Sequence, residues 1–153
     1  MDLILWRHAQ AHDAQASQSD LERQLTSLGE EQAAHMAAWL AQYLPKKTRI
    51  LASPARRTEQ TVRALSHDYA LSDELAPGAT VAELLELVKW PSANGAVLVV
   101  GHQPVLGQTI AQLIGLKAGQ CSVKKAAVWW LRSQEHGAGS QAAVFAVQSP
   151  SFV

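Results

Sequence analysis

Two short apolar runs, each leading into a histidine, constrain the fold of this chain most. The first covers residues 3–6 and is followed by Arg7 and His8, and the second covers residues 97–100 and leads to His102. Runs of this length without a polar position are typical of strands that are buried on both faces of a parallel sheet. Ligands bind at the carboxyl ends of strands in open α/β sheets. The two histidines are therefore predicted to lie together at one edge of the same sheet.

Capping signals place helices between the strands. Thr26 and Thr80 are good N-cap residues, Ser53-Pro54 has the Ser and Pro expected at a helix start, and Gly115 ends a helical segment. The predicted helices cover residues 27–43, 53–66, 80–90 and 104–114, and the predicted strands cover residues 2–6, 49–52, 96–100, 126–132 and 141–148.

The remaining segments are assigned more loosely. The polar segment 9–24 is expected to form a long, partly mobile loop, and such loops are often functional in compact domains. Residues 71–78 are a connector, and residues 137–140 form a Gly/Ser turn between the last two strands. Helical spacing in the first helix predicts an inward face made of Leu28, Gln32, Met36, Trp39, Leu40 and Tyr43.

Alternating strands and helices predict an α/β protein, a three-layer sandwich with a central, mostly parallel sheet flanked by helices. The length of 153 residues favours one domain over residues 1–153, and a hydrophobic fraction of 48% supplies a core. Thirteen Lys and Arg balance thirteen Asp and Glu, so nothing in the overall charge attracts nucleic acid or an acidic membrane.

The sequence also bounds the chemistry and the compartment. Cys121 is the single cysteine, which excludes an internal disulfide and fits a reducing compartment. The Cys and His spacings do not match a zinc site. The first apolar run is too short for a signal peptide or a membrane helix, so we expect a cytoplasmic protein.

Four motifs in order resemble the histidine phosphatase superfamily and, within it, the short SixA-type phosphohistidine phosphatases. They are Leu-Trp-Arg-His-Ala at 5–9, Leu-Thr-Ser-Leu-Gly-Glu-Glu-Gln-Ala at 25–33, Ser-Pro-Ala-Arg-Arg-Thr-Glu-Gln-Thr at 53–61 and Val-Gly-His-Gln-Pro at 100–104. Ala9 departs from the Gly that most of the superfamily carries, and the phosphohistidine branch tolerates either residue. The resemblance implies a phosphoglycerate mutase-like fold.

The resemblance also implies the roles of four residues. His8 is the nucleophile that takes a phosphoryl group, and a hydrogen bond to its other nitrogen would fix its tautomer. Arg7 and Arg57 hold the phosphoryl oxygens, for which a planar, permanently charged guanidinium is suited. His102 is a charge partner of the same oxygens. The family pattern Ser-Pro-x-x-Arg selects Arg57 over Arg56, which would point about 100° away on a helix.

Three further contributions are left open. Arg23, in the polar loop, is a candidate for binding substrate. The start of the helix at residues 103–104 would point backbone N–H groups at the site. Glu74 is the candidate general acid, although its surroundings lack the rest of the mutase-type pattern.

The expected function is a phosphohistidine phosphatase, a hydrolase that needs no metal or cofactor and forms phospho-His8. An imidazole leaving group needs less acid help than an alkoxide, which favours a P–N substrate. The expected partner is a protein that carries phosphohistidine, such as a phosphotransfer domain, and the oligomeric state is open. The alternatives are a small-molecule phosphomonoesterase or mutase of the same fold, and a non-catalytic module that binds phosphorylated proteins.

Overall fold

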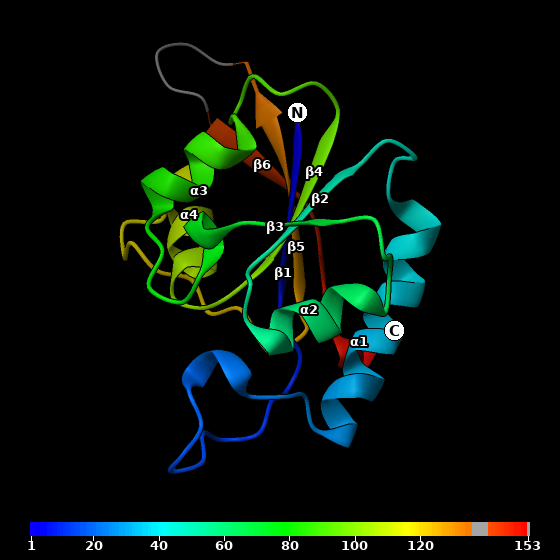
Figure 1. The fold of residues 1–153 in the computed structure, drawn as a ribbon. Coiled ribbons are helices and arrows are strands. Elements are labelled where there is room, and N and C mark those ends of the chain that lie inside the picture. The colour runs from blue at the N-terminus through cyan, green and yellow to red at the C-terminus, as the bar shows by residue number, and fades with distance from the viewer. Residues whose placement is uncertain (136–140, 153) are drawn as a thin grey trace.

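A six-stranded sheet forms the centre of the molecule in the computed structural model, which describes residues 1–135 and 141–152 (Figure 1). Its strand order is β3-β2-β4-β1-β5-β6. The pairs among β3, β2, β4 and β1 are parallel, and β5 is antiparallel to both β1 and β6. The strands are β1 (Asp2–Arg7), β2 (Arg49–Ala52), β3 (Ala70–Leu71), β4 (Ala96–Gly101), β5 (Val128–Gln134) and β6 (Gln141–Gln148). The predicted mostly parallel α/β sheet is confirmed.

Helices cover both faces of this sheet. Figure 1 shows α1 and α2 on one side and α3 and α4 on the other, which gives the three predicted layers. The helices are α1 (Ser27–Tyr43), α2 (Arg56–Arg63), α3 (Val81–Val88) and α4 (Val105–Ile114), with short 3₁₀ helices η1 (Asp20–Glu22), η2 (Asp73–Leu75) and η3 (Pro150–Phe152).

Strand β1 shows how the sequence divides the core between the two layers. Ile4 and Trp6 pack in the apolar cluster that contains Met36 of α1, whereas Leu3 and Leu5 pack in the cluster on the opposite face. All four strand side chains are fully buried. Burying a large apolar side chain contributes about 1.5–3 kcal/mol, so β1 is held firmly from both sides.

The inward face of α1 differs from the predicted one. Leu28 and Tyr43 are 50% and 59% exposed, respectively. The buried positions are instead Gly29, Ala33, Met36, Ala37 and Leu40. Small residues face inward at the start of the helix because the loop approaches it closely there, and a Cβ on Gly29 would lie 2.0 Å from the Gln10 carbonyl oxygen.

Helix α2 starts later and ends earlier than predicted. Its N-cap is Ala55, and the helix runs from Arg56 to Arg63 instead of from residue 53 to 66. The Ser53 backbone N–H continues the sheet by donating to the Val100 carbonyl at 3.1 Å, so the chain is still extended at that point. The Ser53 hydroxyl bonds a histidine described below.

Other boundaries shift by a few residues. The long loop contains η1 and an isolated bridge between Ala11 and Leu25, and the predicted connector contains the two-residue strand β3 and η2. Helix α4 begins at Val105 with Pro104 as its N-cap, and β5 runs two residues later at both ends than predicted. The turn expected at residues 137–140 lies outside the described residues.

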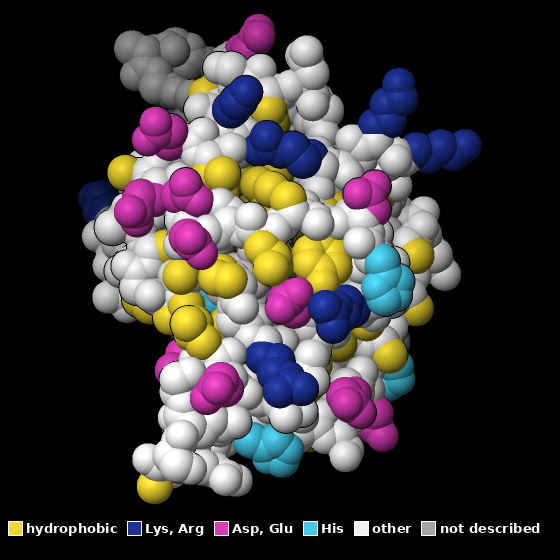
Figure 2. All heavy atoms as spheres, in the orientation of Figure 1, with side chains coloured by type: hydrophobic (Ala, Val, Ile, Leu, Met, Phe, Trp, Pro, Cys, Tyr) yellow, Lys and Arg dark blue, Asp and Glu magenta, His cyan; other side chains and the backbone are white. Residues whose placement is uncertain are grey.

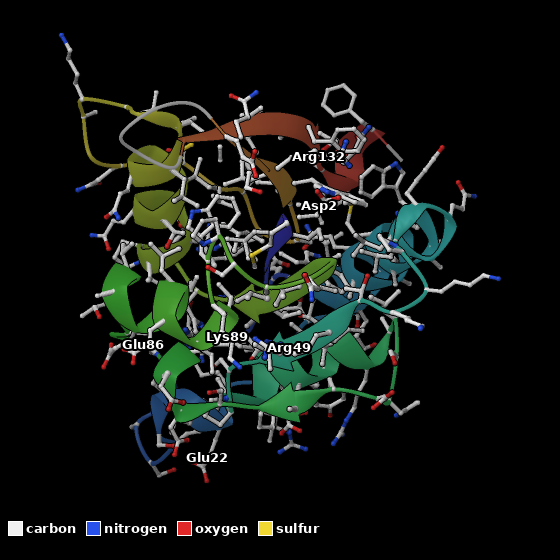
Figure 3. All side chains as sticks on the ribbon, turned by 90° about the horizontal axis from the view of Figure 1, so that it is seen from above. Asp2, Glu22, Arg49, Glu86, Lys89 and Arg132 are labelled. Atoms are coloured by element: carbon white, nitrogen blue, oxygen red, sulfur yellow. The ribbon has the colours of Figure 1, made fainter. Side chains whose placement is uncertain are left out.

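An ion pair joins the amino end of β1 to β5. Arg132 donates from Nε and Nη2 to the two carboxylate oxygens of Asp2 at 2.8 and 2.9 Å, and Trp130 Nε1 donates to the same carboxylate at 3.0 Å (Figure 3). A hollow of about 410 Å³ lies beside this pair, and its lining includes the aromatic side chains of Trp39, Tyr43, Trp130 and Phe145. It is about 17 Å from the other end of β1, given about 3.3 Å per strand residue.

The surface is mixed in charge. Figure 2 shows Lys and Arg interspersed with Asp and Glu on the face that it displays. Within residues 1–135 and 141–152, none of the helices combines the length and the apolar character that crossing a bilayer would take.

Candidate active site

His8 and His102 meet at the carboxyl edge of the sheet. They follow β1 and β4, which are adjacent and parallel, with Arg7 in register with Gly101. The His8 backbone N–H donates to the Gly101 carbonyl at 3.1 Å, which continues the ladder by one residue. The two imidazole rings lie 5.3 Å apart between centroids. The loop that carries η1 extends beyond this edge (Figure 1).

The environment of His8 leaves one ring nitrogen free to attack. Nδ1 lies 2.7 Å from the Ala9 carbonyl oxygen, which only accepts, so Nδ1 carries the proton and Nε2 has a lone pair. Burial lowers the pKa of His8 to about 4, assisted by the charges of Arg57, Arg7 and Arg23 and opposed by the Ala9 hydrogen bond. The imidazole is therefore neutral and nucleophilic at neutral pH.

His102 is held in the opposite tautomer. Arg57 Nη2 donates to His102 Nδ1 at 3.3 Å, so His102 Nε2 carries the proton and donates to Ser53 Oγ at 2.7 Å. Burial and the charge of Arg57 lower the pKa of His102 to about 3. The sequence led us to expect a charged partner here, but in this arrangement His102 is neutral because burial and the arginines disfavour its cation.

Arg57 faces the two histidines, whereas Arg56 is exposed. Arg57 is 3% exposed and donates from Nη1 to the Asp20 carbonyl at 2.8 Å and from Nη2 to the Asp20 carboxylate at 3.0 Å. Burial lowers the pKa of Arg57, and the Asp20 carboxylate partly opposes this effect. Arg57, which the family pattern and the helical offset select, is therefore the arginine of this pair that contacts His102.

Arg7 reaches the site from the end of β1. Its Nη1 donates to the Val123 carbonyl at 2.8 Å, and both burial and the nearby Arg57 lower its pKa. The effect of Arg57 on the pKa of Arg7 indicates that the two guanidinium groups share one region. Among the described residues, Nε of Arg7 and Nε of Arg57 are buried donors without an acceptor. Two clustered cations with unused donors make an anion-binding site.

Arg23 also belongs to this cluster because it is bonded to Asp20, a residue that the sequence analysis did not single out. Arg23 donates from Nε to the Asp20 carboxylate at 3.0 Å and from Nη1 to the His12 carbonyl at 3.0 Å. Its charge lowers the pKa of both His8 and His102. Asp20 lies three positions before Arg23, but the sequence carries no sign that its carboxylate also meets Arg57, 37 residues further along the chain.

Two other supporting residues were missed as well. Thr61 Oγ1 accepts from the Ala9 backbone N–H at 3.0 Å, which fixes the segment next to His8. The Gln103 side chain accepts from the Gly107 N–H at 2.7 Å and donates to the Cys121 carbonyl at 2.9 Å. The Gln103 side chain therefore connects α4 to the loop that contains Val123, whose carbonyl accepts from Arg7. Packing around a buried site decides such roles, and local sequence does not encode them.

Two expected contributions do not reach the histidines. Glu74 is exposed and accepts a hydrogen bond from the Ser72 hydroxyl. It follows β3, three strands from β1 in the sheet, or about 14 Å at about 4.8 Å per strand. The start of α4 offers few free amides, because Leu106 N–H donates to the His102 carbonyl and Gly107 N–H to Gln103.

The geometry supports one kind of chemistry. A neutral imidazole with a free Nε2 lies beside three arginines and a second neutral imidazole, so the site can bind an oxyanion and attack its central atom. No three His, Cys, Asp or Glu side chains gather as a metal site within the part of the chain that the structure describes.

Comparisons with known proteins agree with this geometry. The model of the histidine phosphatase superfamily (branch 1) matches residues 3–79, about half of the chain. A phosphohistidine phosphatase SixA homolog from Haemophilus influenzae is 30% identical, with 75% of this chain and 78% of that one covered. Phosphohistidine phosphatase SixA from Escherichia coli is 31% identical, with 74% of each chain covered.

The fold is shared with a solved structure of the same name. The protein histidine phosphatase SixA, solved in complex with tungstate, superimposes with a TM-score of 0.78 at 27% identity over 99% of both chains. The match over residues 3–79 includes His8 and Arg57, and the structural match extends over β4 and His102. The chain therefore belongs to the histidine phosphatase superfamily.

Proposed function

We propose that this protein is a protein phosphohistidine phosphatase that works through a phosphorylated His8. The observation that carries the proposal is the state of His8: its Nε2 is unprotonated, its imidazole is largely buried, and the ring lies beside Arg7, Arg57 and His102. The relatives named SixA support the same substrate class, because their names describe phosphohistidine phosphatases. Tungstate, bound in one of the SixA structures, is a tetrahedral oxyanion like phosphate.

The reaction runs in two displacements. In the first, the substrate imidazole carries a proton on its other ring nitrogen, the His8 Nε2 lone pair attacks phosphorus, and the P–N bond to the substrate histidine breaks to release a neutral imidazole. In the second, a water molecule attacks phospho-His8, the new P–N bond breaks, and phosphate leaves. The sum is one water consumed, one phosphate released and both histidines restored.

The arginines supply the electrostatic part of the mechanism. Charge on the phosphoryl oxygens is held by Arg7 and Arg57, which stay cationic although burial lowers their pKa. A bound dianion also favours protonation of His102, because a nearby negative charge raises the pKa of an imidazole. His102 would then become the charge partner that the resemblance implies, but only while the phosphoryl group is present.

The distant position of Glu74 favours a P–N substrate over an alkyl ester. An alkoxide leaves slowly without a general acid, whose help is typically worth about 10²–10⁴-fold. Glu74 is exposed and bonded to Ser72, so it is not placed to protonate a leaving group at His8. An imidazole is a far better leaving group and needs no such residue.

The finer assignments are also part of this proposal. The partner is a folded protein that presents phosphohistidine, with a phosphotransfer domain as the specific candidate. We infer that residues 1–153 act as one domain, because both apolar clusters pack against the same sheet. A cytoplasmic location fits the single cysteine, Cys121.

The test is dephosphorylation of a protein phosphorylated on histidine with phosphoramidate, followed by intact-mass spectrometry. Wild type should remove the phosphoryl group, and His8→Ala should not, whereas His67→Ala should match wild type because His67 is exposed. Glu74→Ala should leave P–N cleavage nearly unchanged. Faster turnover of alkyl phosphates than of phosphohistidine would instead assign a small-molecule phosphomonoesterase.

A further inference from the structure

Asp20 is a carboxylate inside a site built for anions. One carboxylate oxygen accepts from Arg57 Nη2 at 3.0 Å and the other accepts from Arg23 Nε at 3.0 Å. The Asp20 backbone carbonyl also accepts from Arg57 Nη1 at 2.8 Å. Both terminal nitrogens of Arg57 are therefore bonded to a single residue of the η1 loop.

Asp20 is not suited to be the missing general acid. Burial alone would raise its pKa, but hydrogen bonds and charges from Arg57 and Arg23 outweigh this effect and hold the pKa below its usual value. The carboxylate is therefore ionised at neutral pH and has no proton to give. Its role must come from its charge and its hydrogen bonds.

The orientation of Arg57 depends on these hydrogen bonds. Arg57 Nη2 lies between the Asp20 carboxylate and His102 Nδ1, at 3.0 and 3.3 Å. Arg23 comes from the polar loop and donates hydrogen bonds to Asp20 and to the His12 carbonyl. Asp20 thus couples a loop arginine to a buried helix arginine.

Asp20 also sets the charge of the site. Arg7, Arg23 and Arg57 contribute three positive charges, and the two histidines are neutral at pH 7 because their pKa values are about 4 and 3. With the carboxylate included, the net charge is plus two. A net charge of plus two equals that of a phosphoryl dianion in magnitude. An extra positive charge would bind free phosphate more tightly and slow its release.

We propose that Asp20 is a positioning residue that fixes Arg57 and Arg23 beside the histidines and weakens the affinity of the site for the phosphate product. This inference rests on the proposed phosphatase function, because its meaning depends on phosphate being the product. Asp20 accepts hydrogen bonds from both terminal nitrogens of Arg57. A bound phosphoryl group must therefore share these donors with Asp20 or displace its carboxylate. The site therefore binds the phosphoryl group of the substrate and still releases the phosphate product.

The experiment compares Asp20→Asn with wild type in two separate measurements. The first is direct calorimetric titration with inorganic phosphate, which needs no substrate. Removing the charge and freeing the Arg57 donors should tighten phosphate binding by about 3- to 10-fold. The second is kcat on a phosphohistidine protein, which should fall by about 10-fold because the arginines lose their alignment.

Two further variants serve as controls. Asp20→Glu keeps the charge and should keep a phosphate dissociation constant close to that of wild type. Asp13→Asn removes an exposed carboxylate from the same loop and should change neither measurement. In an Arg23→Ala background, Asp20→Asn should have a smaller effect on kcat than in wild type, because one of the coupled partners is already missing.

Each alternative role of Asp20 predicts a different result. Weaker phosphate binding together with lower kcat would assign Asp20 a merely structural role, and no change in either would leave it without any role. Loss of activity limited to substrates with poor leaving groups would make Asp20 an acid. All three outcomes overturn the proposal. If wild type binds phosphate but cleaves no phosphohistidine, the proposed function fails, and the titration still decides whether Asp20 tunes anion affinity.

Discussion

The imidazoles of His8 and His102 lie with ring centroids 5.3 Å apart, although most of the chain separates them in sequence. Adjacent parallel strands bring them together, because β1 and β4 end at the same edge in register. The two rings are held in opposite tautomers, one by a backbone carbonyl and the other by Arg57 and Ser53. The His8 imidazole therefore keeps one ring nitrogen without a hydrogen bond, whereas both ring nitrogens of His102 are bonded.

His8 should carry a covalent phosphoryl group during turnover. Rapid mixing with a phosphohistidine protein, quenched with base because phosphohistidine is acid-labile, should give enzyme with one added phosphoryl group. Peptide mapping should place it on the segment that contains His8, and His8→Ala should carry none. A label on any other histidine of the wild-type enzyme, or turnover by His8→Ala, would contradict the mechanism.

Stability should decline as pH falls from about 6.5 to about 4. Burial lowers the pKa of His8 to about 4 and of His102 to about 3 in the folded protein, against about 6.5 in the unfolded chain. Below pH 6.5 the unfolded chain binds protons that the folded protein does not, so the free energy of unfolding decreases. Each unit of pKa shift corresponds to about 1.4 kcal/mol, so the loss should reach a few kcal/mol.

Urea unfolding at pH 7 and pH 5 measures this effect. His8→Ala should lose less stability than wild type between the two values, because one buried titrating group is gone. His67→Ala should show the wild-type loss, since His67 is exposed. An equal loss in all three proteins would mean that other groups cause the acid sensitivity.

Arg57→Lys should lower kcat/KM by about 10- to 100-fold, in line with the loss of one or two hydrogen bonds from a charged donor. Lysine keeps the charge but lacks the planar fork that reaches Asp20 and His102 together. Arg56→Lys is the matched control and should behave like wild type, because Arg56 is exposed. Steady-state kinetics on one phosphohistidine protein compares the two, and equal effects would argue against Arg57 as the site arginine.

Gly29→Ala should destabilise the fold by about 1–3 kcal/mol. The added Cβ would lie 2.0 Å from the Gln10 carbonyl oxygen, which is backbone and cannot rotate away. Glu31→Ala, at an exposed position of the same helix, should stay within about 0.5 kcal/mol of wild type. Chemical denaturation measures both, and a neutral Gly29→Ala would show that the loop after β1 can shift freely.

Activity should not depend on an added metal. The nucleophile in the proposed mechanism is the His8 imidazole, and the arginines neutralise charge that a metal would otherwise neutralise. Phosphohistidine hydrolysis should therefore proceed at the same rate with and without EDTA. A rate lost to the chelator and restored by a divalent ion would require a different mechanism.

Local signals in the sequence predicted the helices and strands that depend mainly on neighbouring residues. Helix α1 has the predicted bounds, and Thr26 and Thr80 cap α1 and α3 as expected. The buried strands β1 and β4 were predicted to within one residue. Capping and uninterrupted apolar runs depend on residues next to one another, so they can be read from the chain directly.

The failures involve residues whose roles depend on distant partners. Ser53 looked like a helix cap, but its hydroxyl bonds His102 and its backbone extends the sheet. Asp20 gave no signal, because its partner Arg57 is remote in sequence. The neutral state of His102 could not be predicted either, since burial and the neighbouring arginines determine it.

The sheet order also has a consequence for the timing of synthesis. Strand β1, which His8 directly follows, is made before the other strands of the sheet, yet its two neighbours are β4 and β5. A growing chain has no partner strand for β1 until residues 96–101 emerge, and the second neighbour is complete only at Gln134. The pairing that brings His8 and His102 together can therefore form only after the chain has been synthesised beyond β4.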